Sequence, residues 1–178
     1  RTRWSVPGRV MRLNAEAAQL LVVLVGVPGS GKSTFARALI DGAPKASRTW
    51  CRVSQDVLGT RGRCIGAAQR ALREGQHVLI DRCNFDEAQR AHWLKLDGGP
   101  DYRLAVHLDV SRADATARVL ARPAHEGGVD SGSMAAAKLR SIVARMDDAF
   151  SPPQATEGFD EVIVCRANEP DGTQLALA

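Results

Sequence analysis

Glycine, lysine and serine residues recur near the start of this chain at a spacing typical of phosphate binding. Gly26 is followed, after four residues, by Gly31, Lys32 and Ser33, which fits the pattern G-x-x-x-x-G-K-[ST] without a mismatch. Glycines let backbone N–H groups approach an anion closely, and a helix beginning near Lys32 would point its positive end at the same place. We therefore expect ATP, or another nucleoside triphosphate, to contact the loop through Gly26, Pro28, Gly29, Ser30, Gly31, Lys32, Ser33 and Thr34.

Two side chains of this loop have distinct expected roles. Lys32 is expected to reach the β and γ phosphates, and the Ser33 hydroxyl is expected to ligate Mg²⁺. The alternative is a glycine-rich turn between a strand and a helix that binds nothing. The context favours phosphate binding, because an apolar run, LLVVLV, precedes the loop and an amphipathic helical pattern, FARAL, follows it.

Acidic residues stand at the ends of two later predicted strands. Asp56 comes just after the stretch TWCRVS, and Asp81 ends the stretch HVLID. In open parallel sheets the ligand lies beyond the carboxyl ends of the strands. Asp56 could there accept the proton of an attacking hydroxyl, and Asp81 could hold Mg²⁺ directly or through water. The structural alternatives are a helix-capping role for Asp56 and a strand-end turn for Asp81.

Two arginines on a later predicted helix could close over the phosphates. Arg118 and Arg122 are four residues apart, so they share one helical face, and a glycine-containing loop, HEGGVDSG, follows shortly after them. Their guanidinium groups could form part of a mobile lid that neutralises developing charge. A solvated helix face explains the same pair equally well.

The elements that position these residues alternate along the chain. The strand patterns are mostly continuous apolar runs, which indicates a parallel sheet that helices cover on both faces, and hence an α/β fold. We predict five strands, over residues 20–26, 49–54, 77–81, 103–108 and 159–165. Helices are predicted from about residue 32 and over 62–73, 86–96, 111–122 and 133–150.

Size and composition favour one compact domain. We divide the 178 residues into a basic linker or N-terminal arm over 1–19, a main domain over 20–168 and a tail over 169–178. The first dozen residues hold four arginines and no acid, so an arm that grips nucleic acid is the alternative to a solvated linker. A net charge of +4 fits a polyanionic partner, but it fits a nucleotide-binding protein as well.

Cysteine usage and hydropathy indicate the redox environment and the cellular location. The four cysteines are scattered without a C-x-x-C pair, so we expect reduced thiols in or near the core. The longest apolar run is too short to cross a bilayer, and no signal-peptide pattern precedes it. We therefore expect no membrane association and a nuclear or cytoplasmic location.

Several segments together resemble a known family. GVPGSGKSTFA, VSQDVLGTRGRC, ALREGQHVLIDRCNFDEAQRAHW and MDDAFSPPQATEGFDEVIV are similar to the kinase domain of 5′-hydroxyl polynucleotide kinases. That family includes the kinase domain fused to a phosphatase in repair enzymes and kinase-like modules beside aprataxin-type domains. The resemblance covers roughly residues 20–166 and implies a P-loop kinase fold with an α-helical lid. The loop is specific only for phosphate binding, and the Q-D-x-L-G and I-D-x-x-N segments discriminate better.

The resemblance implies roles for individual residues of the nucleotide site. Lys32 and Ser33 would hold the phosphates of ATP and Mg²⁺, and Asp56 would be the general base that activates the 5′-hydroxyl. Arg122 stands where the family has its lid arginine, and Arg118 lies one turn before it.

The resemblance also implies substrate contacts. Asp81 and Asn84 correspond to the acid and the amide of the I-D-x-x-N segment, which would order metal, water and substrate, and Arg61 or Arg63 would touch the 3′ phosphate of the substrate. One departure is Arg82-Cys83 before the asparagine, where the family usually has threonine, and the added positive charge suggests a different substrate contact. The short, glycine-rich lid leaves the choice of nucleobase open.

The expected function is an ATP- and Mg²⁺-dependent kinase that transfers the γ-phosphate to the 5′-hydroxyl end of DNA or RNA in nucleic-acid end repair. One alternative is a P-loop kinase for a small alcohol or nucleoside, with a closed acceptor pocket. Another is a non-catalytic nucleotide-binding module of a larger repair protein. A fused repair domain outside this stretch is compatible with each of them.

Overall fold

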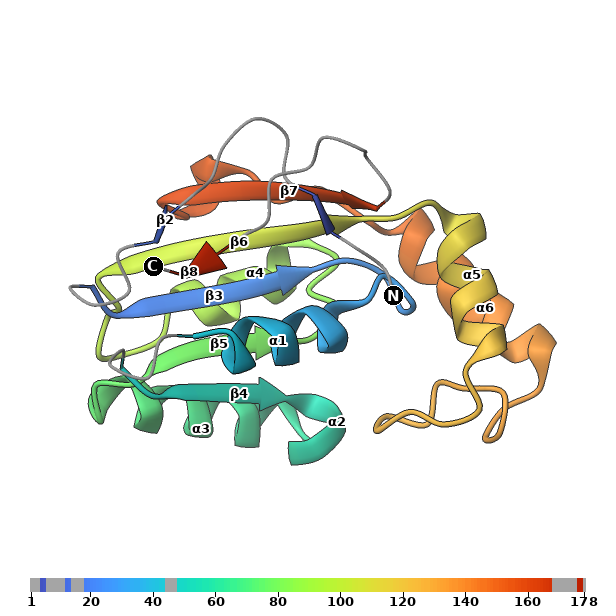
Figure 1. Cartoon of the computed structure of the whole chain (residues 1–178), viewed down its shortest axis with the longest axis horizontal. Helices are drawn as coiled ribbons and strands as arrows, with labels where there is room; N and C mark the ends of the chain where they lie inside the picture. Colours follow the sequence, from blue (N-terminus) through green and yellow to red (C-terminus); the bar gives the residue numbers. More distant parts are fainter. Residues whose placement is uncertain (1–3, 6–11, 14–17, 44–47, 168–175, 178) are drawn as a thin grey trace.

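The main sheet has five parallel strands and one short antiparallel edge strand (Figure 1). The computed structural model of the chain describes residues 4–5, 12–13, 18–43, 48–167 and 176–177. Within them the strand order is β1-β7-β6-β3-β5-β4, with β3 in the centre of the parallel set. The strands are β1 (Trp4–Ser5), β3 (Leu20–Val25), β4 (Trp50–Ser54), β5 (His77–Asp81), β6 (Tyr102–Asp109) and β7 (Glu161–Ala167).

Helices cover both faces of this sheet, and two more lie beyond the carboxyl ends of the strands. In Figure 1, α1 lies in front of the sheet, α3 and α4 lie behind it, and α5 and α6 lie beside each other past the strand arrowheads. The helices are α1 (Lys32–Asp41), α2 (Gln55–Leu58), α3 (Arg61–Arg73), α4 (Glu87–Leu94), α5 (Arg112–Ala121) and α6 (Ala136–Asp148), with a 3-10 turn, η1, over Ala155–Glu157.

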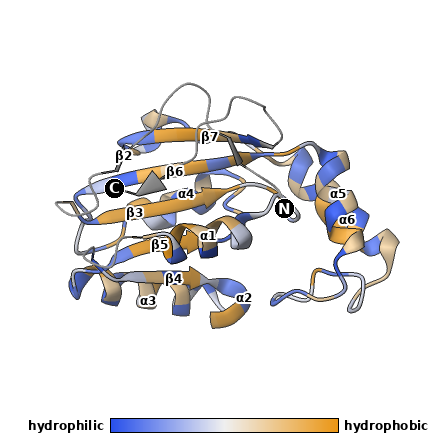
Figure 2. Cartoon of the chain, viewed as in Figure 1, coloured by the Kyte–Doolittle hydropathy of each residue, from blue (hydrophilic) through white to orange (hydrophobic). Residues whose placement is uncertain are grey.

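The central strand β3 is buried on both faces. Leu20, Val22 and Leu24 pack in a cluster with Phe35 and Leu39 of α1, whereas the alternate residues of β3 pack in a second cluster with α3. Figure 2 shows the central strands as hydrophobic along most of their length. Each fully buried aliphatic side chain contributes about 1.5–3 kcal/mol. The predicted parallel sheet, covered on both faces, is therefore confirmed.

The lid helices have a smaller core of their own. Ala115 and Val119 of α5 pack with Leu139 and Val143 of α6 and with Val27 of the glycine-rich loop. The loop is thus attached to both the sheet and the helical lid.

Two helices differ most from the predictions. The chain forms a one-turn helix, α2, directly after β4, where no helix was predicted. The helix predicted over 133–150 begins later, at Ala136, because the carboxylate of Asp130 accepts the Ser133 N–H at 2.8 Å and holds a turn before it. Side chains cap two of the predicted helices, since Asp86 accepts from Gln89 N at 2.7 Å before α4 and Ser111 accepts from Asp114 N at 3.0 Å before α5.

The predicted arm over 1–19 and tail over 169–178 lie mostly outside the described residues. Two short strands, β2 (Arg12–Leu13) and β8 (Ala176–Leu177), pair in parallel, and β1 pairs with β7. The four cysteines are free thiols, as expected, and burial raises the pKa of Cys165 to about 12. Across the described ranges, no helix is long and apolar enough to span a bilayer.

Candidate active site

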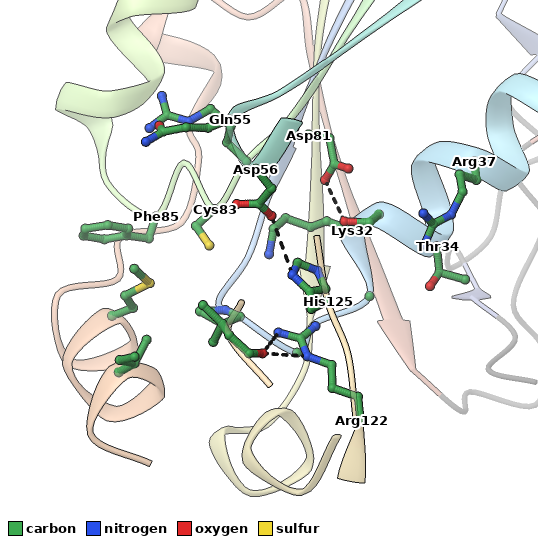
Figure 3. A pocket seen from close by; sticks show the side chains of 18 of the residues that line it. Lys32, Thr34, Arg37, Gln55, Asp56, Asp81, Cys83, Phe85, Arg122 and His125 are labelled. Carbon is green, nitrogen blue, oxygen red and sulfur yellow. Dashed lines mark hydrogen bonds and ion pairs between the residues drawn. The ribbon is translucent and has the colours of Figure 1, made fainter. Parts of the chain in front are cut away.

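A cavity of about 480 Å³ lies at the carboxyl ends of the strands, between the glycine-rich loop and the helical lid (Figure 3). The loop, the turns after β4 and β5, and the segment from α5 to α6 all contribute to its wall. The lining residues are Pro28, Gly29, Gly31, Lys32, Ser33, Thr34, Arg37, Gln55, Asp56, Asp81, Arg82, Cys83, Phe85, Gln89, Arg122, Ala124, His125, Val129, Ile142 and Met146.

The loop has the backbone geometry that its glycines predict. Gly29 and Gly31 have φ values of 86° and 100°, in the left-handed region that disfavours other residues. A Cβ at Gly29 would lie 2.3 Å from the Ala115 carbonyl oxygen, so α5 packs directly on the loop. Six of the eight predicted loop residues line the cavity, whereas Gly26 and Ser30 lie behind it.

The Lys32 ammonium lies within the curve of the loop. It donates hydrogen bonds to the carbonyl oxygens of Gly26 at 2.9 Å and Val27 at 2.8 Å, and to Ser30 Oγ at 3.2 Å. Only 8% of Lys32 is exposed, so burial and these three acceptors hold its charge beside the loop amides. The loop therefore presents concentrated positive potential to the cavity.

Asp81 lies where a divalent cation would bind. The Ser33 hydroxyl donates to Asp81 Oδ1 at 3.3 Å, while the Arg52 guanidinium donates to Oδ2 at 2.6 and 2.8 Å. A carboxylate and a hydroxyl oxygen at one position are ligands that Mg²⁺ accepts, with water and phosphate completing its shell. Over the described ranges, no cluster of three or more His, Cys, Asp or Glu could hold a metal by itself.

Asp56 lines the cavity from the helical turn that follows β4. It lies in the first turn of α2, for which Ser54 is the N-cap, so the capping interpretation of Asp56 is wrong. Its carboxylate is 39% exposed and faces His125 of the lid, with Nδ1 3.7 Å from Oδ2 (Figure 3). Asp56 is therefore an accessible carboxylate that shares a cavity with Lys32 and Ser33.

The lid loop covers this carboxylate. A Cβ at Gly127 would lie 2.3 Å from Asp56 Oδ1, so the lid backbone packs directly on it. His125 Nδ1 accepts the Gly127 N–H at 3.1 Å, which requires that nitrogen to be unprotonated. Burial, and then the nearby charge of Arg122, lower the pKa of His125, so a neutral imidazole faces Asp56. The lid loop therefore restricts access to Asp56, whose side chain stays 39% exposed.

Glu126 holds the lid loop to the sheet. It pairs with Arg52 at 2.9 Å and with Arg37 at 3.3 Å, and Arg52 in turn pairs with Asp81. These pairs lower the pKa of Glu126, chiefly through its hydrogen bond to Arg52. The guanidinium group of Arg52 thus connects the lid loop to Asp81.

The two lid arginines differ in position. Arg122 lines the cavity and donates from both Nε and Nη2 to the Val129 carbonyl oxygen, the Nε bond being 2.8 Å long. Burial lowers its pKa. Arg118 does not line the cavity, so its predicted contact with the nucleotide has no support in this arrangement.

Three predicted substrate residues lie outside the cavity. Arg61 contacts His92, with Nη1 3.0 Å from Nε2, and Arg63 is an exposed residue in the first turn of α3. Asn84 is fully buried: its Nδ2 donates to the Leu24 carbonyl oxygen and its Oδ1 accepts from Trp93 Nε1, both at 2.8 Å. The prediction that Asn84 contacts the substrate is therefore wrong, because its buried amide group holds the turn after β5.

Several site residues carry no signal in the sequence. Arg52 is in the middle of β4, and Glu126 is in a loop that composition alone described as mobile. Gln55 directly precedes Asp56, but no motif singled it out. Phe85 follows β5 and likewise belongs to no motif that predicts a site residue. Only the folding of distant segments onto each other brings Gln55 and Phe85 to the cavity wall and joins Arg52 and Glu126 to Asp81, which lines it.

Replacing Glu126 by Gln is expected to loosen the lid. The change removes the partner charge of Arg37 and Arg52, and partly exposed pairs of this kind contribute about 0.2–1 kcal/mol. Amide hydrogens of residues 124–129 should exchange up to about fivefold faster than in the unaltered protein. Exchange in β3 should not change, and equal protection of the lid in both proteins would contradict the role of Glu126.

The imidazole of His125 should titrate below its ordinary value of about 6.5. The pKa of His125 is lowered in the closed lid, so the closed lid favours the neutral imidazole. Lid closure is therefore complete at a pH above the ordinary pKa of histidine, and it weakens as the pH falls from there through the lowered pKa. An NMR titration of the imidazole measures this pKa directly. A pKa above about 6.5 in the unaltered protein would show that Asp56 holds a charged imidazole instead.

Comparison with known proteins gives relatives over most of this chain. It is 39% identical over 157 residues to "Transcription factor bHLH140" of Arabidopsis thaliana, which covers 84% of this chain and 16% of that protein. It is 32% identical over 147 residues to the "Bifunctional polynucleotide phosphatase/kinase" of Schizosaccharomyces pombe, which covers 81% of this chain and 33% of that protein. The chain thus spans a third or less of each relative. No protein-family model matches it.

Solved structures share the fold at low sequence identity. A fungal RNA kinase aligns with a TM-score of 0.69 and 16% identity, over 88% of this chain and 79% of that one. Chaetomium thermophilum Kti12 in complex with ADP-AlF3 aligns with a TM-score of 0.59 and 16% identity, over 81% of this chain and 87% of that one. A gluconokinase from Sinorhizobium meliloti aligns with a TM-score of 0.54 and 14% identity, over 90% of this chain and 86% of that one. These structures confirm the P-loop kinase fold. The similarity to the polynucleotide phosphatase/kinase confirms the resemblance to polynucleotide kinase domains. The fold by itself does not determine which acceptor is phosphorylated.

Proposed function

We propose that this chain is a kinase domain that transfers the γ-phosphate of ATP, with Mg²⁺, to the 5′-hydroxyl end of DNA or RNA. One observation carries the proposal: Asp56, Lys32, Ser33 and Arg122, which stem from three separate segments, line one cavity. The similarity to part of a polynucleotide phosphatase/kinase supports a polynucleotide as the acceptor. We further propose that the domain acts in end repair, in the nucleus or cytoplasm, as one module of a longer protein.

The electrostatics of the cavity support a polyanionic acceptor. Besides Lys32, its wall holds the guanidinium groups of Arg37, Arg82 and Arg122. Each phosphate that such a wall neutralises releases counterions, so affinity for an oligonucleotide should fall as salt rises. A small neutral alcohol would not need this charge, so the kinase of small molecules is the weaker candidate.

The geometry suggests a direct mechanism of transfer. The loop amides and Lys32 hold the β and γ phosphates, and the 5′-hydroxyl approaches from the side of Asp56. As the hydroxyl oxygen bonds to the γ-phosphorus, its proton passes to the Asp56 carboxylate, and the bond from the γ-phosphorus to the β–γ bridging oxygen breaks to release ADP. Arg122, released from Val129 when the lid rearranges, is placed to stabilise the charge that develops.

The residues for a cation fit Mg²⁺. Ser33 Oγ and Asp81 Oδ1 are 3.3 Å apart, and Asp81 already has its other oxygen paired with Arg52. When bound, Mg²⁺ would neutralise phosphate charge beside the loop. Arg52 orients the carboxylate so that one oxygen stays directed at Ser33.

A labelled-phosphate assay tests the proposal. We expect transfer of the γ-phosphate of ATP to a 5′-hydroxyl oligonucleotide, with dependence on Mg²⁺, and no transfer to an oligonucleotide that already has a 5′-phosphate. Transfer to nucleosides or sugars at the same efficiency as to oligonucleotides would favour the small-molecule kinase. Tight nucleotide binding without turnover for any acceptor would favour the non-catalytic module.

A further inference from the structure

A buried carboxylate in the lid has no part in the mechanism proposed above. Asp130 lies in the segment between α5 and α6, and only 1% of it is exposed. Its Oδ1 accepts the Ser133 N–H at 2.8 Å, and the backbone N–H groups of His125 and Gly132 are further donors to it. Burial alone would raise the pKa of Asp130, but the hydrogen bonds from the loop outweigh burial and lower it. Asp130 is therefore a buried charge that the surrounding loop keeps ionised.

The residues on either side of Asp130 hold Arg122. The Val129 carbonyl oxygen accepts from both Nε and Nη2 of Arg122, and the Nε bond is 2.8 Å long. Ser131 donates to the Arg122 carbonyl oxygen from its backbone N–H at 3.1 Å and from its hydroxyl at 2.9 Å. Three consecutive residues, 129–131, thus fix both the side chain and the main chain of the lid arginine.

The charge of Asp130 also acts on Arg122. Burial lowers the pKa of Arg122, and the negative charge of Asp130 opposes this effect more than the charge of Asp56 does. The guanidinium donates to the neutral Val129 carbonyl, whereas the Asp130 carboxylate accepts from N–H groups of the loop. Asp130 therefore stabilises the charge of Arg122 and leaves its hydrogen bonds on an acceptor that a stronger one can replace.

The lid loop is closed on itself. A Cβ at Gly132 would lie 2.3 Å from the Pro123 carbonyl oxygen, so the two ends of the loop pack backbone to backbone. In the middle of the loop, the Gly128 N–H donates to the His125 carbonyl oxygen at 2.9 Å, and the His125 N–H donates to Asp130. In Figure 1 the loop extends from α5 and α6 toward α2. A loop that is ordered in advance loses less conformational entropy when a ligand binds.

We propose that Asp130 is a positioning residue: its carboxylate holds the lid loop in one conformation, so that Arg122 is in place before the triphosphate binds. Asp130 itself does not touch the substrates, because it is buried and is not part of the cavity wall. When phosphate enters, an anionic oxygen replaces the Val129 carbonyl as the acceptor of Arg122, because a charge-assisted hydrogen bond is the stronger of the two. This inference rests on the proposed kinase function and adds to it a residue that no motif indicated.

Asp130→Asn removes the charge and keeps the size of the side chain. We expect kcat for the labelled-phosphate transfer to fall about 10- to 100-fold, less than the roughly 10²- to 10³-fold loss expected for Arg122→Gln, because the guanidinium is kept but poorly placed. The KM for ATP should change by less than about threefold, because the contacts of Lys32 are unaltered. The matched control is Asp148→Asn, which removes an exposed acid of α6 outside the cavity and should leave kcat unchanged.

A double-mutant cycle separates positioning from a general loss of stability. If Asp130 acts through Arg122, adding Asp130→Asn to the Arg122→Gln protein should lower kcat by no more than about twofold. Two independent defects would multiply instead. Ser131→Ala removes a single hydroxyl hydrogen bond to the main chain of Arg122 at an exposed position, so kcat should fall about 2- to 5-fold. This smaller effect should also vanish in the Arg122→Gln protein.

Hydrogen exchange tests the same contacts without catalysis. In the Asp130→Asn protein, the three amides that donate to the carboxylate should exchange about 10-fold faster or more, because they lose a charged acceptor. They are the amides of His125, Gly132 and Ser133. Exchange in β3 should not change, because the lid helices have a core of their own.

Three results would overturn the role of Asp130. If the unaltered protein phosphorylates no acceptor, the kinase proposal fails and the positioning role falls with it. If the unaltered protein is a kinase, the positioning role alone fails when Asp130→Asn has a normal kcat or lowers kcat equally with and without Arg122. Unchanged exchange of the three amides would show that the loop is ordered without the carboxylate, which also contradicts the proposal.

Discussion

Replacing Asp56 by Asn is expected to lower kcat for phosphorylation of a 5′-hydroxyl oligonucleotide by about 10²- to 10⁴-fold. The amide has the size of the carboxylate but cannot accept the proton of the attacking hydroxyl. Asp56 faces His125, whereas Lys32 bonds to the carbonyl oxygens of Gly26 and Val27, so the KM for ATP should stay within about twofold. Steady-state rates with the labelled-phosphate assay measure both values.

The matched control for this substitution is Asp41→Asn. Asp41 is the exposed last residue of α1 and does not line the cavity, so removing its charge should leave kcat unchanged. The Asp56→Asn protein should also melt at nearly the same temperature as the unaltered protein, because the carboxylate is 39% exposed. Full activity of Asp56→Asn would show that another group, or water, accepts the proton.

Replacing Glu157 by Gln is expected to lower the free energy of unfolding by about 3–5 kcal/mol. Glu157 pairs with Arg90 through two hydrogen bonds of 2.7 Å, and their side chains are only 6% and 1% exposed. Loss of the carboxylate charge leaves a buried guanidinium without compensation. Equilibrium unfolding in urea measures the change, which is a large part of the roughly 5–15 kcal/mol typical of a whole domain.

The control for the Glu157 substitution is an exposed ion pair. Arg112 pairs with Asp147 and Asp148 at the surface, so Arg112→Gln should not shift the urea midpoint detectably. A midpoint for Glu157→Gln equal to that of Arg112→Gln would contradict a stabilising role for the buried pair. Replacing both Arg90 and Glu157 by apolar residues should recover part of the loss, because no unpaired charge then remains.

The buried pair also acts on the active site. Arg90 donates to the Asn84 carbonyl oxygen at 3.1 Å and to the Ser151 carbonyl oxygen at 2.9 Å. Asn84 has a φ of 45°, which costs free energy for a residue other than glycine, so its surroundings must hold it. The turn that carries Arg82 and Phe85 to the cavity therefore depends on a salt bridge whose residues do not line the cavity.

The sequence by itself determined the features that depend on short stretches of chain. The phosphate loop, the alternation of strands and helices, and the caps at Asp86 and Ser111 were all predictable, because each needs only neighbours a few residues away. The positions of Asp56 and Asp81 followed from one general rule, that ligands bind past the carboxyl ends of parallel strands.

Only the tertiary structure decided which polar residues near those strand ends face the cavity. Asn84 is directed into the core by Leu24 and Trp93, whereas Arg82, two residues earlier, lines the cavity. Glu126 reaches Arg52 across 74 positions of the chain, and local propensity carries no information about such a contact. The physical reason is that side-chain direction at a turn is set by the packing of distant segments, which a linear pattern of residue types does not specify.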